Sequence, residues 1–263
     1  MNRISNKFEQ LRSQKNKALI PYITPEFPFK GITVPLLFEL EKSGADIIEI
    51  GIPFSDPLAD GATIQHSSEL ALKNGANIQK ILAEVKEFRK SSELPLILMG
   101  YINPVLRFGV RNFFEECSAA GVDGLIIPDL PPEEASEIRI ASKEQSISNV
   151  FLIAPTTRNE RIKKIDDAST DFTYCVSVTG VTGARNQFGT NGSLEHFLQR
   201  VRENVKKPFV VGFGISTSDH VKKVWAHADG AVVGSALIDV LSKASNEKEA
   251  LQKSGQFLRS LRR

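Results

Sequence analysis

Cysteine is scarce in this sequence, which has 2 such residues, Cys117 and Cys175. They form no Cys-x-x-Cys pair and fall in different expected elements, so we expect reduced thiols rather than a disulfide framework or a zinc site. The 4 histidines are scattered, and the two that share an expected helix, His220 and His227, are seven residues apart with no cysteine nearby. We therefore predict that the chain has no metal site.

A charge excess and long apolar runs are also absent. The formal net charge of +2 offers no electrostatic basis for binding nucleic acid or an anionic membrane. The first 14 residues are polar and of mixed charge, without the apolar core of a signal peptide. No uninterrupted apolar run approaches the ~18 residues of a membrane span. With 41% hydrophobic and 24% charged residues, the composition is typical of a soluble globular protein, which we expect in the cytoplasm.

Short apolar segments alternate with segments of helical periodicity along the whole chain. Eight segments are apolar throughout rather than alternating, which is typical of parallel strands covered on both faces. They span residues 18–23, 46–50, 94–99, 123–128, 149–154, 172–177, 208–212 and 229–234. Helical spacing follows the strands, for example at 132–143 and at 216–227 with Ser216 as N-cap, and it also occurs at 1–13, whereas 101–104 is an expected turn.

Eight βα units in about 250 residues are typical of a closed barrel. We therefore predict an α/β fold in which residues 1–263 form a single-domain (β/α)8 TIM barrel with an extra N-terminal helix. An open, doubly wound sheet is the alternative. It would need a Gly-x-Gly-x-x-Gly motif after the first strand, where this sequence has Thr24, Pro25 and Glu26.

The most unusual stretch runs from Asp46 to Gly61, where an apolar strand leads into an acidic, proline-containing loop. Glu49 lies inside the strand, where an unpaired carboxylate is costly to bury. If its side chain points into the barrel mouth, it is an acid–base group with a raised pKa. The alternative is that it points outward and pairs with a lysine. Asp60, at the far end of the loop, is either a second catalytic carboxylate or the N-cap of the following helix.

Glycines mark the loops after the last three expected strands, at residues 179–183, 212–216 and 234–235. Such loops let backbone N–H groups approach an anion, and the last two are the usual phosphate site of this fold. The alternative is that the glycines only form tight turns.

Aromatic and apolar side chains also stand at expected strand ends: Tyr22, Met99, Tyr174 and Phe213. They are suited to wall a flat apolar ligand, although each alone is more often part of a core. The combination predicts proton-transfer chemistry on a phosphorylated substrate, with no metal or organic cofactor required.

The stretch Glu49–Gly61, read as EIGIPFSDPLADG and followed by Ile64 and Gln65, closely resembles the signature of the tryptophan synthase alpha subunit family. Further segments resemble that family in the same order along the chain: YINP at 101–104, PDLP at 128–131, APTT at 154–157, SVTGVTG at 177–183 and GFGI at 212–215. Ala62 and Gly100 depart from the family pattern, which commonly has a proline and a larger residue there.

The resemblance implies a (β/α)8 barrel that cleaves indole-3-glycerol phosphate to indole and glyceraldehyde 3-phosphate. It implies that Glu49 and Asp60 are the catalytic acids and that Tyr174 lies beside the substrate. It further implies that Gly180, Phe213, Gly214, Gly234 and Ser235 form the phosphate cradle and that residues 179–192 form a lid.

The resemblance also implies a partner, the tryptophan synthase beta subunit, in an α2β2 assembly. Pyridoxal phosphate would be held by that partner, and none would be bound by this chain. Segments with Pro53, Asp56, Asn103 and Pro104 resemble the contacts with the beta subunit. Two other functions stay open: a subunit that mainly activates its partner, and an isomerase or aldolase of another phosphate-binding barrel. An aldolase that works through a Schiff base needs a strand lysine, and the eight segments contain none.

Overall fold

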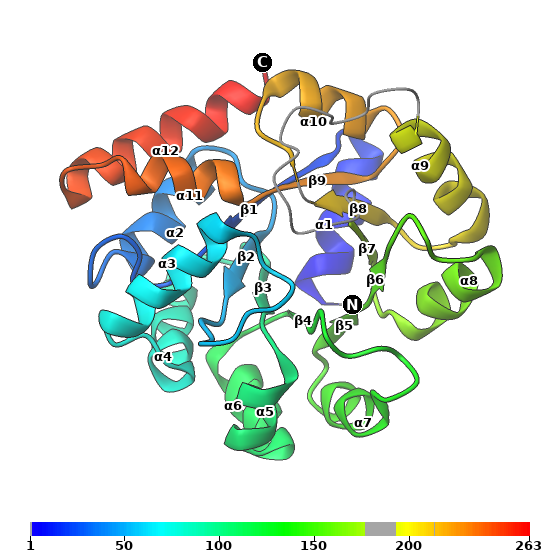
Figure 1. Ribbon diagram of the computed structural model, residues 1–263, viewed down its shortest axis with the longest axis horizontal. Coiled ribbons are helices and arrows are strands. Elements are labelled where there is room, and N and C mark those ends of the chain that lie inside the picture. Colours follow the sequence, from blue (N-terminus) through cyan, green and yellow to red (C-terminus); the bar gives the residue numbers. More distant parts are fainter. Residues whose placement is uncertain (1, 177–192, 213) are drawn as a thin grey trace.

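In the computed structural model, which describes residues 2–176, 193–212 and 214–263, short parallel strands surround a central core (Figure 1). The strands are β1 Ala18–Ile23, β2 Ile48–Gly51, β3 Leu96–Met99, β4 Gly124–Ile126, β5 Ser148–Val150, β6 Leu152–Ile153, β7 Thr173–Val176, β8 Phe209–Gly212 and β9 Gly230–Val233. Their hydrogen-bonded order is β5-β4-β3-β2-β1-β9-β8-β7-β6. The sequence prediction of a parallel α/β barrel is thereby confirmed.

Within the described residues the barrel has nine strands where the sequence predicts eight, because the expected strand at 149–154 is in two parts. Its first part, β5, pairs with β4, and its second part, β6, pairs with β7. Phe151 separates them, and its N–H donates to the Oγ atom of Ser169 at 3.2 Å instead of to a strand. One continuous segment therefore joins the two ends of the sheet and completes the ring.

Helices surround the barrel on its outside in Figure 1, except for the first. They are α1 Arg3–Ser13, α2 Thr33–Lys42, α3 Ala62–Lys73, α4 Ile78–Arg89, α5 Ile102–Phe108, α6 Val110–Ala120, α7 Ser136–Glu144, α8 Asn159–Ala168, α9 Ser193–Asn204, α10 Ser218–Trp225, α11 Ser235–Ser242 and α12 Glu247–Leu261. The extra N-terminal helix predicted at 1–13 is present as α1.

Three local predictions were wrong. The turn at 101–104 is the start of a helix, α5, because Pro104 sits in the first turn, where its missing N–H is not needed. Helix α7 begins at Ser136, four residues after the predicted start at Pro132. Helix α10 is capped by Thr217, whose side chain accepts from the His220 N–H, and not by Ser216.

Helix α1 closes the end of the barrel where the strands begin. It lies inside the ring of the other helices in Figure 1. Ile4 is fully buried and its Cδ1 atom is 3.0 Å from where a Cβ of Gly124 would stand, so the glycine leaves room for it. The Phe8 ring packs on that of Phe172 with centroids 5.4 Å apart. This end is therefore filled, and the opposite end is left for a binding site.

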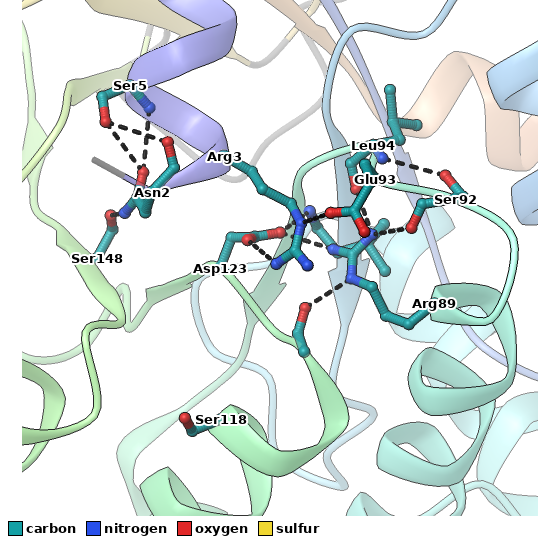
Figure 2. Close-up of polar contacts among 12 residues, drawn as sticks. Asn2, Arg3, Ser5, Arg89, Ser92, Glu93, Leu94, Ser118, Asp123 and Ser148 are labelled. Atoms are coloured by element: carbon teal, nitrogen blue, oxygen red, sulfur yellow. Dashed lines mark hydrogen bonds and ion pairs between the residues drawn. The ribbon is translucent and has the colours of Figure 1, made fainter.

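Three buried or half-buried aspartates, Asp46, Asp123 and Asp229, each stand one or two residues before a strand. Each accepts a backbone N–H from the neighbouring strand and pairs with an arginine. Asp46 is bound by the Leu19 N–H and Arg262, Asp123 by the Leu96 N–H and Arg89, and Asp229 by the Phe209 N–H and Arg202. Figure 2 shows Arg3 of α1 and Arg89 converging on Asp123. The same arrangement of aspartate, backbone N–H and arginine thus recurs around the closed end, and at Asp123 it also ties α1 to that end.

Candidate active site

Glu49 lies in the middle of β2, in register with Tyr22 of β1 and Ile97 of β3, and is 2% exposed. Tyr22 and Tyr174, which come from separate strands of the barrel, both have their pKa raised in part by the Glu49 charge. The side chain therefore faces the barrel interior, and the outward-facing alternative is wrong. Burial, followed by repulsion from Asp60, raises the pKa of Glu49 to about 8.

Asp60 lies at the end of the loop that leaves β2. The helix that follows is capped by Gly61 without any side-chain hydrogen bond, so Asp60 is not its N-cap. Burial raises the pKa of Asp60 to about 6, and the Tyr101 hydroxyl opposes this rise as a hydrogen-bond donor. At neutral pH the two carboxyls therefore differ in state: Glu49 is mostly protonated, and Asp60 is mostly ionised.

Two predicted substrate-binding residues, Tyr22 and Tyr174, place their hydroxyls above glycines of neighbouring strands. A Cβ atom at Gly51 would collide with the Tyr22 hydroxyl, and one at Gly212 would collide with that of Tyr174. Burial raises the pKa of both phenols, and the carboxyls Glu49 and Asp60 raise it further. Both hydroxyls consequently stay protonated, so neither tyrosine adds a charge near the carboxyls.

Met99, the third of these residues within the described part, ends β3 beside Gly51 and Ile126 and is half-buried. Gly100 follows it, and a Cβ there would stand 2.8 Å from the Cβ of Ile52. The departure from the family pattern at Gly100 thus matches the close approach of the Ile52 side chain. Phe213, the fourth predicted residue, lies outside the described residues.

The predicted phosphate-binding residues Gly214, Gly234 and Ser235 follow β8 and β9, which are paired neighbours in the sheet. Gly234 caps α11 and Ser235 begins it, so the first N–H groups of this helix have no partner within it. Gly214 is exposed and has a φ of +78°, which favours glycine. An anion held there would meet the positive end of a helix. Gly180 and the predicted lid at 179–192 lie outside the described residues.

The predicted partner contacts lie on two connected segments, the loop after β2 and helix α5. Asp56 and Asn103 are exposed, and Pro104 is half-buried. Pro53 is buried, so it affects the conformation of the loop and adds little to its exposed surface. The sequence reasoning did not single out two large apolar side chains on the same segments, Leu58 and Leu106, which are 86% and 52% exposed.

Tyr101 is a further site residue; it lies in the YINP segment at 101–104, and the sequence alone indicated no role for its side chain. Its side chain is buried, and its hydroxyl accepts the Ala59 N–H at 2.9 Å. A signal was present in the composition, because the chain has only 3 tyrosines and each stands in an expected strand or within two residues of its end.

Residues 8–262 match the family model described as "Tryptophan synthase alpha chain". The chain belongs to this family. The tryptophan synthase alpha chain of Roseiflexus castenholzii is 46% identical over 263 residues, with 100% of both chains covered. That of Chlorobium chlorochromatii is 44% identical over 264 residues, with 98% of this chain and 99% of the relative covered.

Solved structures of tryptophan synthase alpha chains are similar in fold as well as in sequence. The alpha subunit from Legionella pneumophila has a TM-score of 0.91 at 38% identity, covering 100% of this chain and 97% of that one. A chain of the tryptophan synthase α2β2 complex from Pyrococcus furiosus has a TM-score of 0.86 at 43% identity, covering 93% of this chain and 97% of that one. The similarity therefore extends over the barrel and is not limited to the motif after β2.

The known activity of the tryptophan synthase alpha family is that of a lyase, the cleavage of indole-3-glycerol phosphate.

Among the described residues, no group of three or more His, Cys, Asp or Glu side chains is placed to hold a metal ion. In the same part of the chain, no helix combines the length and apolar character that a membrane crossing requires.

Proposed function

We propose that Glu49 and Asp60 are the two residues with which this chain cleaves indole-3-glycerol phosphate to indole and glyceraldehyde 3-phosphate. One observation carries the proposal: a buried and a half-buried carboxyl at the open end of the barrel, Glu49 and Asp60, have their pKa values raised to about 8 and about 6. Neutral pH lies between these values, so one group is an acid and the other an anion. The reaction needs one of each.

Asp60 is the anion in this mechanism. Protonation of the indole ring at the carbon that bears the glycerol side chain leaves positive charge on the ring nitrogen. A carboxylate that accepts a hydrogen bond from the ring N–H stabilises this charge as it develops. Partial burial strengthens the interaction, because little water is present to screen it.

Glu49 is the acid and then the base. Its carboxyl proton goes to the substituted ring carbon, and the resulting carboxylate removes the proton from the side-chain hydroxyl next to that carbon. The electron pair of the carbon–carbon bond returns to the ring as indole leaves, and the hydroxyl carbon becomes the aldehyde. Glu49 ends in its protonated form, so no external proton donor is consumed.

The remaining site residues hold the substrate at its two ends. The N–H groups at Gly214, Gly234 and Ser235 bind the phosphate at the start of α11, and Gly180, outside the described residues, is a further phosphate-binding residue in this proposal. Tyr22, Met99, Tyr174 and Phe213 enclose the indole ring with apolar surface. In this arrangement the glycerol chain lies between the two sets, next to the carboxyls.

The chain works, in this proposal, as one domain over residues 1–263 in the cytoplasm, together with a tryptophan synthase beta subunit in an α2β2 assembly. Pro53, Asp56, Asn103 and Pro104 lie on the segments that contact the partner. The beta subunit holds pyridoxal phosphate in this family, and this chain itself takes no cofactor. The support for the partner is the family membership and the Pyrococcus furiosus complex.

The test is an indole-release assay on the purified chain, with and without a beta subunit. We expect Glu49→Gln and Asp60→Asn each to lower turnover by about a thousandfold, the size typical of losing an acid–base group. Glu69→Gln and Asp167→Asn are matched controls, because both side chains are exposed and lie in surface ion pairs. Near-normal turnover by both site variants would exclude the mechanism and favour a subunit that only activates its partner.

A further inference from the structure

We propose that Tyr101 is a positioning residue for Asp60, fixing the loop that carries this carboxylate through its hydroxyl. The inference rests on the proposed role of Asp60 and extends it, because a carboxylate at the end of a surface loop needs a fixed support to act on a substrate.

Tyr101 is held rigidly by the backbone on both sides. The Gly100 N–H donates to the Ile126 carbonyl of β4 at 3.0 Å, and the Ile102 N–H donates to the Asp129 carboxylate at 3.0 Å. Tyr101 itself is the N-cap residue of α5 and is 6% exposed. Its side chain therefore starts from a fixed point between β3 and α5.

The side chain contacts the loop after β2 at two places. Its ring packs against that of Phe54, near the start of the loop, with centroids 5.5 Å apart. Its hydroxyl accepts the N–H of Ala59, directly before Asp60, at 2.9 Å. Ala59 is otherwise exposed, and the backbone around Asp60 is also held from within the loop, by the Asp60 N–H to the Pro57 carbonyl at 3.0 Å, and from α3, by the Gln65 side chain to the Asp60 carbonyl at 2.9 Å. The Tyr101 hydroxyl adds the restraint that ties this backbone to the segment after β3.

The hydroxyl has a proton to donate as well as a lone pair that accepts. It faces the Asp60 carboxylate, where it lowers the pKa of Asp60 against the effect of burial. Burial and the Asp60 charge raise the pKa of Tyr101, so the phenol stays protonated at any working pH. The other titratable groups that sense Asp60 are Glu49, Tyr22 and Tyr174. Among these described groups, none is a cation, so Tyr101 stabilises the ionised form without a positive charge.

The variant Tyr101→Phe removes the hydroxyl and keeps the ring against Phe54. Loss of a hydrogen bond to an ionised group raises the pKa of that group by about one unit. We expect the acid side of the pH profile of kcat/KM for indole release to move to higher pH by that amount. We expect kcat at pH 7 to fall about tenfold while KM changes less than about threefold. An unchanged pH profile would overturn the inference.

Phe54→Leu is the matched control, because it removes the ring contact and keeps the hydroxyl. If Tyr101 acted only through packing, Phe54→Leu would move the acid side of the profile and Tyr101→Phe, which keeps the ring contact, would leave it unchanged; that outcome would make the inference wrong. Asp60→Asn separates the two proposals. If Asp60→Asn retains turnover, the proposed function fails; if it loses turnover while Tyr101→Phe behaves like the parent chain, only the role of Tyr101 fails.

A second measurement uses the unsubstituted chain and does not depend on how a variant folds. We expect hydrogen exchange of the Ala59 amide to be at least tenfold slower than in an unstructured peptide, because the Tyr101 hydroxyl accepts its proton. Exchange at the unprotected rate would overturn the inference.

Discussion

Glu49 and Asp60 have the same functional group, and their surroundings make them chemically different. Glu49 is buried within a strand, and repulsion from Asp60 adds to the rise of its pKa. Asp60 lies on a loop, is half-buried and has the Tyr101 hydroxyl close by, so its pKa rises less. Two carboxyls with pKa values on either side of 7 form a natural acid and anion pair.

The pH dependence of kcat/KM follows from these two pKa values. Asp60 must be ionised, so activity should rise as the pH passes about 6. Glu49 must be protonated, so activity should fall as the pH passes about 8. The profile of indole release should be bell-shaped between these values. In Asp60→Asn the repulsion that raises the pKa of Glu49 is removed, so the alkaline side of the residual activity should move to lower pH.

The phosphate of the substrate also titrates, near pH 6. The residual activity of Asp60→Asn distinguishes the two groups. If its acid side stays at the same pH as in the parent chain, that side belongs to the substrate phosphate, and the assignment to Asp60 would be incorrect.

At the scale of elements, the barrel repeats one arrangement at the end where its strands begin. Asp123 accepts from the Leu96 N–H at 2.8 Å and pairs with both Arg89 and Arg3, so it joins β3, β4, α4 and α1. Burial raises the pKa of this carboxyl even though two arginines lower it. Such a group is stable in the fold only while all its partners are present.

Asp123→Ala should destabilise the chain by about 3 kcal/mol or more, because it leaves the Arg89 guanidinium and the Leu96 N–H without their buried partner. The measurement is the midpoint of urea unfolding. Glu93→Ala is the control: Glu93 also pairs with Arg3, but its side chain is 79% exposed, and we expect a change below about 1 kcal/mol. Equal effects of the two substitutions would show that the closed end of the barrel is not held in this way.

At the scale of the whole molecule, the active site reduces the stability of the barrel. The folded state holds Glu49 with a pKa of about 8, whereas the unfolded chain ionises it near 4.5. The folded state therefore binds the extra proton between these two values, and stability falls as the pH rises through that range. This cost is the counterpart of a carboxyl kept ready to donate a proton.

Glu49→Gln should remove this cost, since an amide stays neutral at every pH. We expect the variant to be more stable than the parent chain at pH 9 by on the order of 4 kcal/mol, and by less than about 1 kcal/mol at pH 5. Thermal or urea unfolding at the two pH values measures the effect. The control Glu69→Gln, at an exposed position, should give no such gain. A variant that is less stable at pH 9 would contradict a buried, neutral Glu49.

Several features of the site depended on contacts that the sequence does not display. The alternation of side chains along β2 shows that Glu49 points to the side opposite Ile48 and Ile50. It does not show which of the two sides faces the barrel interior. The role of Asp60 as a helix cap was excluded only when the helix was seen to begin after Gly61. The motif at 101–104 predicted a turn, and only the folded chain brought Tyr101 to Ala59, 42 residues away in sequence.

The sequence by itself determined most of the strands and helices, the parallel barrel and the family. Apolar runs, helical periodicity and a motif from Glu49 to Gly61 are local properties, and local chemistry is enough to specify them. Only the tertiary structure decided which way Glu49 faces, how the ring closes at Phe151, and which hydroxyl supports Asp60. These features arise from residues far apart in the chain that meet when the barrel closes, because their pKa values and hydrogen bonds depend on the neighbours and the burial that closure creates.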